Sequence, residues 1–324
     1  MLARAAVGLG SLALTGCYGS ADRREAIHTL RSALDMGVPL IDTADHYAGG
    51  AVERMIREAV SGEPGNGTLI STCGGLRFAR DGTLIGVDGS PGYLRRACEA
   101  SLRRLGRGHI DVYYLARADP RVPLEDSLGV LADLVTEGKI RSIGLSGVSA
   151  EQLRLAHAAY PVGALAVEYS LMERRAELEL LPAARELGVQ VVACRPLGRG
   201  LLTGRIASAE ALASGDVRRG QDRFRADQFR RHAWRVRAAG EVATGMSAGL
   251  TRLALAWLLS RQGGVVPVPS TRHGLHLEMN VTSTRLTVGP AESERLEACF
   301  PVGWDEEPAE SAESGEGRLG GRNQ

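Results

Sequence analysis

Short apolar runs alternate with segments of helical periodicity along most of the chain. In the helical segments apolar residues recur three and four positions apart, whereas each intervening run is short enough for a strand buried on both faces of a parallel sheet. Strands are predicted at residues 38–41, 68–73, 110–115, 140–145, 164–168, 189–193 and 264–268. Helices are predicted at residues 21–36, 51–60, 91–105, 124–137, 150–158, 174–187, 233–243 and 250–259.

This alternation predicts an α/β fold. About eight strand–helix units within ~300 residues is the count for one closed (β/α)8 TIM barrel, and a doubly wound sheet is the alternative. Residues 205–231 interrupt the rhythm with a polar, arginine-rich loop in which only short helical fragments are expected. We therefore predict a single barrel domain over residues 1–303, followed by a disordered tail at 304–324 that is rich in Glu, Ser and Gly.

Composition narrows the range of partners and compartments. The 39 basic and 38 acidic side chains nearly cancel, and no basic run with interleaved aromatic residues indicates a nucleic-acid partner. No segment approaches the ~20 consecutive apolar residues of a membrane span. The five cysteines are widely spaced, which predicts a reduced, cytoplasmic protein. Residues 14–17 resemble a lipoprotein cleavage box, but glycines interrupt the apolar run before them, so no cleaved leader is predicted.

The polar residues after the first predicted strand form the strongest candidate site. Residues 38–41 lead directly into Asp42, and Asp45, His46 and Tyr47 follow it within one loop. In (β/α)8 barrels the carboxyl ends of the strands carry the reacting groups. Asp42 and Tyr47 stand five positions apart, so they can meet only if the loop folds back over the strand end. We predict that these two residues form an acid–base pair, and the alternative is a relic pair that is only buried and hydrogen-bonded at the mouth of the barrel.

Four segments of the chain, in order, resemble the aldo-keto reductases. They are residues 37–47, residues 102–105 with 110–115, residues 139–146 and residues 196–200, and the similarity extends from about residue 7 to about residue 281. The resemblance implies an aldo-keto-reductase-like (β/α)8 barrel. It also implies that NADPH binds in an extended pose and that the carbonyl group of a small molecule is reduced at the carboxyl-terminal rim of the barrel.

Two of the four catalytic positions implied by this resemblance are changed. The family's proton donor is a tyrosine helped by an aspartate, a lysine and a histidine, and Asp42 and Tyr47 match two of them. Cys73 stands where the family has the lysine, and Ala116 stands where it has the histidine. A free phenol has a pKa of about 10, and a neighbouring ammonium group lowers it. His46 is the candidate to replace the lost imidazole, with a solvent-facing loop residue as the alternative.

The resemblance also implies a cofactor site. Its candidate residues are Ser146, Leu197, Gly198, Gly200, Ser270, Thr271, Arg272 and Asn280. The nicotinamide end departs from the family pattern, because Ala166 replaces a glutamine and Cys194 replaces a stacking aromatic ring. Arg195 places a cation in this space, either as an anchor for an anionic substrate or as a plug. Cys73, Ala116 and Arg195 are therefore the candidate substrate-binding residues.

Two cysteines and a histidine are expected near the same rim. Cys73, Cys194 and His46 lack a fourth ligand at a known spacing, so no metal site is predicted. Small side chains that fill the rim are the preferred interpretation of the two cysteines, and a nucleophilic thiol is the alternative.

These changes around one ring favour altered chemistry over ordinary reduction. The leading hypothesis is an enzyme that uses Asp42 and Tyr47 for a non-redox proton transfer, such as dehydration, cyclisation or isomerisation, on a small metabolite with a carbonyl or hydroxyl group. One alternative is an NADPH-dependent carbonyl oxidoreductase. Another is a non-catalytic barrel that binds a nucleotide or a partner, because a barrel does not determine its chemistry.

Overall fold

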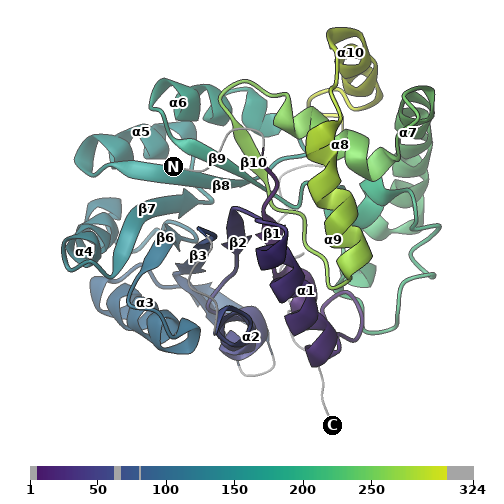
Figure 1. Cartoon of the computed structure of the whole chain (residues 1–324). Helices are drawn as coiled ribbons and strands as arrows, with labels where there is room; N and C mark the ends of the chain where they lie inside the picture. The colour runs from purple at the N-terminus through teal and green to yellow at the C-terminus, as the bar shows by residue number, and fades with distance from the viewer. Residues whose placement is uncertain (1–5, 62–66, 80–81, 305–324) are drawn as a thin grey trace.

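Eight parallel strands form the centre of the protein. The computed structural model describes residues 6–61, 67–79 and 82–304. The strands pair in the order β1-β2-β3-β6-β7-β8-β9-β10, and helices lie outside them (Figure 1). Their bounds are β1 Leu9–Gly10, β2 Leu40–Asp42, β3 Leu69–Gly74, β6 Ile110–Leu115, β7 Ile140–Ser146, β8 Val162–Glu168, β9 Gln190–Cys194 and β10 Val265–Pro267.

Hydrogen bonds bring the chain around the last strand back to the first. The backbone N–H of Gly8 donates to the carbonyl of Pro267 over 2.9 Å, and that of Gly10 donates to the carbonyl of Pro269 over 3.1 Å. Gly10 also forms a parallel bridge with Ser270. A side chain at Gly10 would not fit, because its Cβ would lie 2.6 Å from the carbonyl oxygen of Val268. This arrangement agrees with the predicted (β/α)8 fold.

Ten α-helices occur in the described part of the chain. They are α1 Arg23–Asp35, α2 Ala51–Val60, α3 Pro91–Leu105, α4 Leu124–Thr136, α5 Ala150–Ala159, α6 Leu180–Glu186, α7 Ala226–Gly245, α8 Leu250–Leu259, α9 Gly274–Val281 and α10 Pro290–Cys299. Local signals fix several of their ends. The Asp22 side chain accepts a hydrogen bond from Glu25 N at the start of α1, and Ser149 and Gln152 form a capping box at the start of α5.

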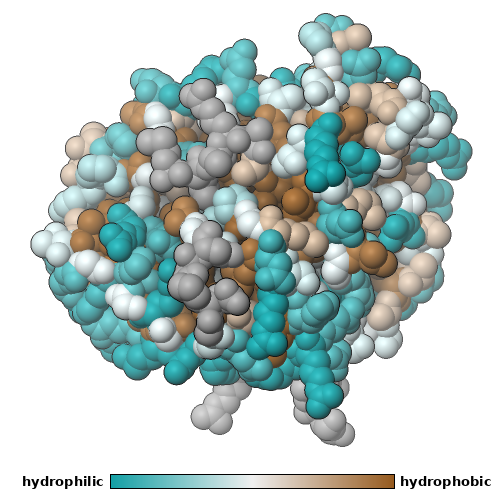
Figure 2. All heavy atoms as spheres, in the orientation of Figure 1, coloured by the Kyte–Doolittle hydropathy of each residue, from teal (hydrophilic) through white to brown (hydrophobic). Residues whose placement is uncertain are grey.

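Buried apolar side chains of the strands belong to three clusters. Ile41 and Leu165 point outwards into the large cluster shared with the helices. Leu40 belongs to a smaller cluster with residues of β9 and β10, and Tyr114 belongs to another with residues of β8. Cys73 and Cys194 pack against this last cluster, which places both thiols above the apolar interior. On the face that Figure 2 shows, hydrophilic residues cover much of the surface and hydrophobic residues are visible between them.

Several predicted elements differ from the structure. The helix predicted at 174–187 is wrong in its first half, where a 3₁₀ turn at Arg175–Glu177 precedes α6. Arg174 there pairs with Glu297 of α10 over 2.8 Å, a contact between distant parts of the chain that local periodicity does not contain. Helix α7 begins at Ala226, inside the stretch predicted as a loop. The hairpin of β4 (Leu76–Phe78) and β5 (Leu84–Val87) was not predicted, nor were α9 and α10.

Membrane and domain predictions can be compared only in part. Within the described ranges no single helix is long and apolar enough to cross a membrane, and α7 and α8, which reach that length and composition together, meet at an angle of 85°. The single domain predicted over residues 1–303 stays a prediction. Apart from Trp304, the predicted disordered tail at 304–324 lies outside the described residues.

Candidate active site

A cavity of about 660 Å³ opens where the strands end. It falls within the range of small-molecule and cofactor sites, which is about 300–1,000 Å³. Of the predicted site residues, Gly198 alone is absent from its lining. Those that line it are Asp42, His46, Tyr47, Cys73, Ala116, Ser146, Arg195, Leu197, Gly200, Ser270, Thr271, Arg272 and Asn280.

Asp42 occupies the carboxyl end of β2. The parallel register of β2 and β3 sets it opposite Ser71, whose Oγ donates a hydrogen bond of 2.5 Å to Asp42 Oδ1. Burial raises the pKa of Asp42 from its ordinary value to about 6, although the hydrogen bond from Ser71 acts in the opposite direction. The carboxyl group therefore titrates close to the pH range in which a general acid–base catalyst is most useful.

Tyr47 reaches the same cavity because the chain turns back after β2. Its backbone N–H donates to the carbonyl of Ala44 over 3.2 Å, and Ala48 follows in the left-handed conformation with φ of 48°. Burial raises the pKa of Tyr47 well above its ordinary value, the Asp42 carboxylate adds to this increase, and the Arg195 guanidinium opposes it. The predicted return of the loop over the strand end is thus present.

Cys73 and Ala116, which stand where the family resemblance implies the two helpers, both line the cavity. Cys73 is on β3, and the backbone N–H of Ala116 donates to the carbonyl of Gly74 over 2.9 Å. Burial raises the pKa of the Cys73 thiol well above its ordinary value, and the neighbouring carboxylate of Asp45 raises it further. A neutral thiol and a methyl group therefore occupy the positions implied for an ammonium and an imidazole.

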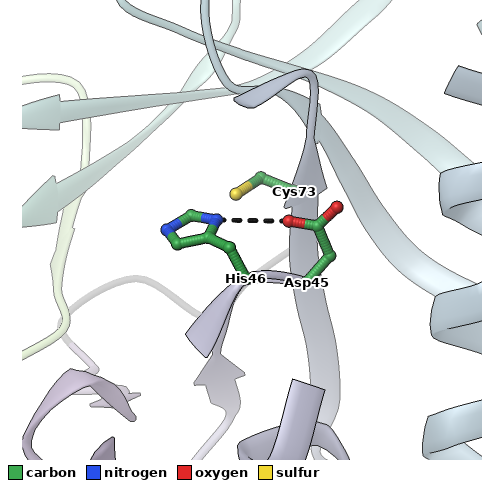
Figure 3. A group of neighbouring side chains, drawn as sticks. All are labelled: Asp45, His46 and Cys73. Atoms are coloured by element: carbon green, nitrogen blue, oxygen red, sulfur yellow. Dashed lines mark hydrogen bonds and ion pairs between the residues drawn. The ribbon is translucent and has the colours of Figure 1, made fainter. Parts of the chain in front are cut away.

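His46 is enclosed, so the solvent-facing alternative for this residue is wrong. Its side chain is 11% exposed, and its Nδ1 lies 3.2 Å from Asp45 Oδ1 (Figure 3). The imidazole stacks on Phe78 of the β4–β5 hairpin with a centroid distance of 4.4 Å, and its edge meets the Tyr47 ring at 5.0 Å. Sequence reasoning missed the contribution of Phe78, because a short hairpin gives little periodic signal.

Arg195 is held on the opposite wall by the partly buried carboxylate of Glu168. Its Nη1 lies 2.7 Å from Glu168 Oε2, and Nη2 of Arg199 approaches the same oxygen at 3.3 Å. Arg223 Nη1 lies 3.5 Å from the other oxygen. Burial alone would raise the pKa of Glu168, but the three guanidinium groups hold it well below its ordinary value. Sequence reasoning missed this cluster because its members come from distant segments.

Ser270, Arg272 and Asn280, which are predicted to hold the nucleotide, also line the cavity. Ser270 Oγ accepts a hydrogen bond of 2.6 Å from Ala13 N, which ties the loop after β10 to the chain after β1. Arg272 Nη1 donates to the carbonyls of Tyr18 and Gly19 over 3.3 and 3.0 Å. Asn280 is buried on α9. Guanidinium, hydroxyl and amide groups thus line the same cavity as the acid–base pair.

Comparisons with known proteins agree with this arrangement. Residues 6–300 match the model of the Aldo/keto reductase family. A probable aldo-keto reductase from Glycine max is 33% identical over 298 residues, which cover 92% of this chain and 86% of that protein. The structure of a glycerol dehydrogenase from Gluconobacter oxydans has a TM-score of 0.83 at 27% identity and covers 92% of this chain and 91% of its own. The fold is also similar to that of a Klebsiella pneumoniae aldo/keto reductase in complex with NADP and acetate, with a TM-score of 0.71 at 24% identity over 93% of each chain.

Proposed function

Because the chain belongs to the aldo/keto reductase family, we propose that it is an NADP(H)-dependent oxidoreductase that interconverts a carbonyl and a hydroxyl group of a small molecule. One observation carries the proposal. A single cavity is lined by Asp42 and Tyr47 and also by Arg272 and Asn280, so an acid–base pair and groups that suit a nucleotide share one site. The dehydrogenase of similar structure adds support for redox chemistry of a hydroxyl group.

The donor groups fit a dinucleotide better at its phosphate end than at its nicotinamide end. Arg272 and Asn280 offer positive charge and amide hydrogen bonds, which suit a phosphate group and an adenine ring. When bound, the nicotinamide supplies or accepts a hydride. Ala166 and Cys194, which line the cavity and stand where the resemblance implies nicotinamide contacts, offer neither a side-chain amide nor an aromatic face. We therefore expect the cofactor to be held mainly through its nucleotide half.

In this proposal the protein's own residues position the substrate and move one proton. Tyr47 Oη transfers the proton to or from the substrate oxygen, and the Asp42 carboxyl group in the same cavity stabilises the tyrosine during this transfer. Arg195 provides a fixed cation on the other wall. The pair Asp42–Tyr47 is therefore used for proton transfer in both the redox and the non-redox hypotheses, and the two differ in whether a hydride moves.

A non-redox proton transfer is the second candidate, and the changed helper positions favour it. Cys73 and Ala116 leave Tyr47 without the ammonium and imidazole implied by the family resemblance, so reduction loses electrostatic stabilisation that is worth about 3 kcal/mol for a single positioned donor. Asp42 can serve as a general acid or base near neutral pH. Dehydration, cyclisation or isomerisation of a hydroxy-carbonyl compound then needs no nicotinamide contact.

A cofactor titration combined with one substitution separates the two candidates. NADPH binding is followed by the cofactor's fluorescence, and turnover by its absorbance, with a panel of aldehydes and ketones. The redox proposal expects saturable binding, and turnover that Tyr47→Phe reduces by at least about 100-fold, because a positioned proton donor contributes about 10²–10⁴-fold. Binding without turnover, or no binding, refutes redox catalysis and leaves the proton-transfer candidate.

We also propose that the protein is cytoplasmic, as the widely spaced cysteines predict.

A further inference from the structure

Three potential metal ligands meet on the cavity wall at the lysine-replacing position. The ligand atoms of Asp45, His46 and Cys73 all lie within 4.8 Å of one another. Figure 3 shows the imidazole and the carboxylate joined by their contact, with the Cys73 sulfur beside them. Two segments supply this set, the loop after β2 and the end of β3. The sequence indicated His46 and Cys73, together with Cys194, as possible metal ligands, but it did not indicate Asp45.

We propose that Asp45, His46 and Cys73 bind a zinc ion, with one coordination position left open to the cavity. Thiolate, imidazole and carboxylate are the ligand types that zinc accepts, and catalytic zinc sites commonly have three protein ligands and one open position. In a tetrahedral site with zinc–ligand bonds of about 2.0–2.3 Å, neighbouring ligand atoms stand about 3.3–3.7 Å apart. The 3.2 Å between His46 Nδ1 and Asp45 Oδ1 already matches one edge.

The backbone fixes the three ligands before any ion arrives. The N–H of Asp45 donates to the carbonyl of Cys73 over 3.3 Å, which holds the loop against the end of β3. Stacking on Phe78 and the edge contact with Tyr47 restrict the imidazole. The Cys73 sulfur lies within 4.8 Å of the other two ligand atoms, and the thiol proton passes to solvent as the zinc–sulfur bond forms.

Charge at this wall also favours a cation. The carboxylates of Asp45, Asp42 and Glu53 lie within electrostatic range of Cys73, and only Glu53 is paired with an arginine, Arg104, in the described contacts of these three. His46, Cys73 and Tyr47 line the same cavity, and Asp45 lies beside the first two. If the proposed function holds, the zinc ion occupies the region where the family resemblance implies an ammonium group and supplies positive charge beside Tyr47.

Zinc binding can be measured without substrate or NADPH, so its failure is distinguishable from failure of the proposed function. Chelator-treated full-length protein receives one equivalent of zinc, is separated from free metal by gel filtration and is analysed for bound metal. We expect one zinc per chain. Cobalt(II) in place of zinc should give a thiolate-to-cobalt charge-transfer band and the visible bands of a tetrahedral site. Absence of stoichiometric zinc, or of the thiolate band, overturns the proposal.

Matched variants identify the ligands. Cys73→Ser should weaken zinc binding by at least about 100-fold, because the loss of outer-sphere groups alone weakens binding by about 10–100-fold. Asp45→Asn should weaken binding in the same direction and also tests the site if Cys73→Ser does not fold. Cys194→Ser is the control, since it removes the other thiol of the cavity and should leave zinc binding unchanged. Equal binding by Cys73→Ser, or a loss caused by Cys194→Ser, overturns the assignment.

Discussion

Replacement of Asp42 with asparagine should stabilise the protein at neutral and alkaline pH. The carboxyl group has a pKa of about 6 in the folded protein against an ordinary value of 3.8, and burial is the main cause. Between these two values the folded state holds more protons than the unfolded state, so stability falls as the pH rises through this window. Asparagine stays neutral and can keep the hydrogen bond from Ser71.

The magnitude follows from the size of this shift. Each pKa unit corresponds to about 1.36 kcal/mol, so ionised Asp42 costs up to about 3 kcal/mol of stability above its folded pKa. Water at the cavity mouth screens the charge and makes this figure an upper limit. Loss of a packed core group destabilises a protein, so the expected increase in stability distinguishes Asp42 from an ordinary core residue.

Urea unfolding of chelator-treated wild type and Asp42→Asn tests the reasoning. At about pH 8 the variant should be more stable by roughly 2–3 kcal/mol, and this difference should vanish near pH 3.8 and below, where both residues are neutral. Ser71→Ala is the matched control, because it removes the hydrogen bond and leaves the buried carboxyl group. An Asp42→Asn variant that is equally or less stable at pH 8 refutes the assignment of a strained carboxylate.

Two further predictions concern buried charges away from the cavity. Burial, together with nearby arginines, lowers the pKa of His232 to about 4. The unfolded state therefore binds more protons below pH 6.5, and stability falls as the pH drops. His232→Leu should reduce this loss of stability by up to about 3 kcal/mol in urea unfolding. Arg104→Met should destabilise the protein by about 3–5 kcal/mol in urea unfolding, because it leaves the buried Glu53 without its ion pair. Additional replacement of Glu53 with Met should recover much of this loss, and no recovery would show that the pair is not the cause.

Elements with their own local signals could be predicted from the sequence. The bounds of α2, α3, α8 and β6 agree with the predictions, since periodicity coincides there with clear ends such as the proline that opens α3. The segment around Arg174 could not be predicted in the same way. Its side chain is buried against Glu177 and Glu297, and the second of these belongs to α10. Such tertiary contacts override local helical preference.

The candidate site shows the same division between local and distant information. Asp42 and Tyr47 could be singled out because they follow one apolar run within a few residues. Glu168 could not be recognised as the anchor of Arg195, because no local pattern links the end of β8 to the loop after β9. Neighbouring strands of a parallel sheet are joined by long connections, so contacts between their ends leave little trace in the sequence.

The two walls of the cavity differ in charge, and this difference constrains how a small molecule can bind. Asp42 ends β2 and Asp45 follows it, whereas Arg195 and Arg199 follow β9. Glu168 holds both arginines, so they form a fixed positive surface. We expect an anionic part of the substrate to face these arginines while its carbonyl or hydroxyl group faces Tyr47. Cys73 stands where the family resemblance implies a lysine, so we expect this wall to lack the positive charge of that lysine, and a cation bound there would supply it.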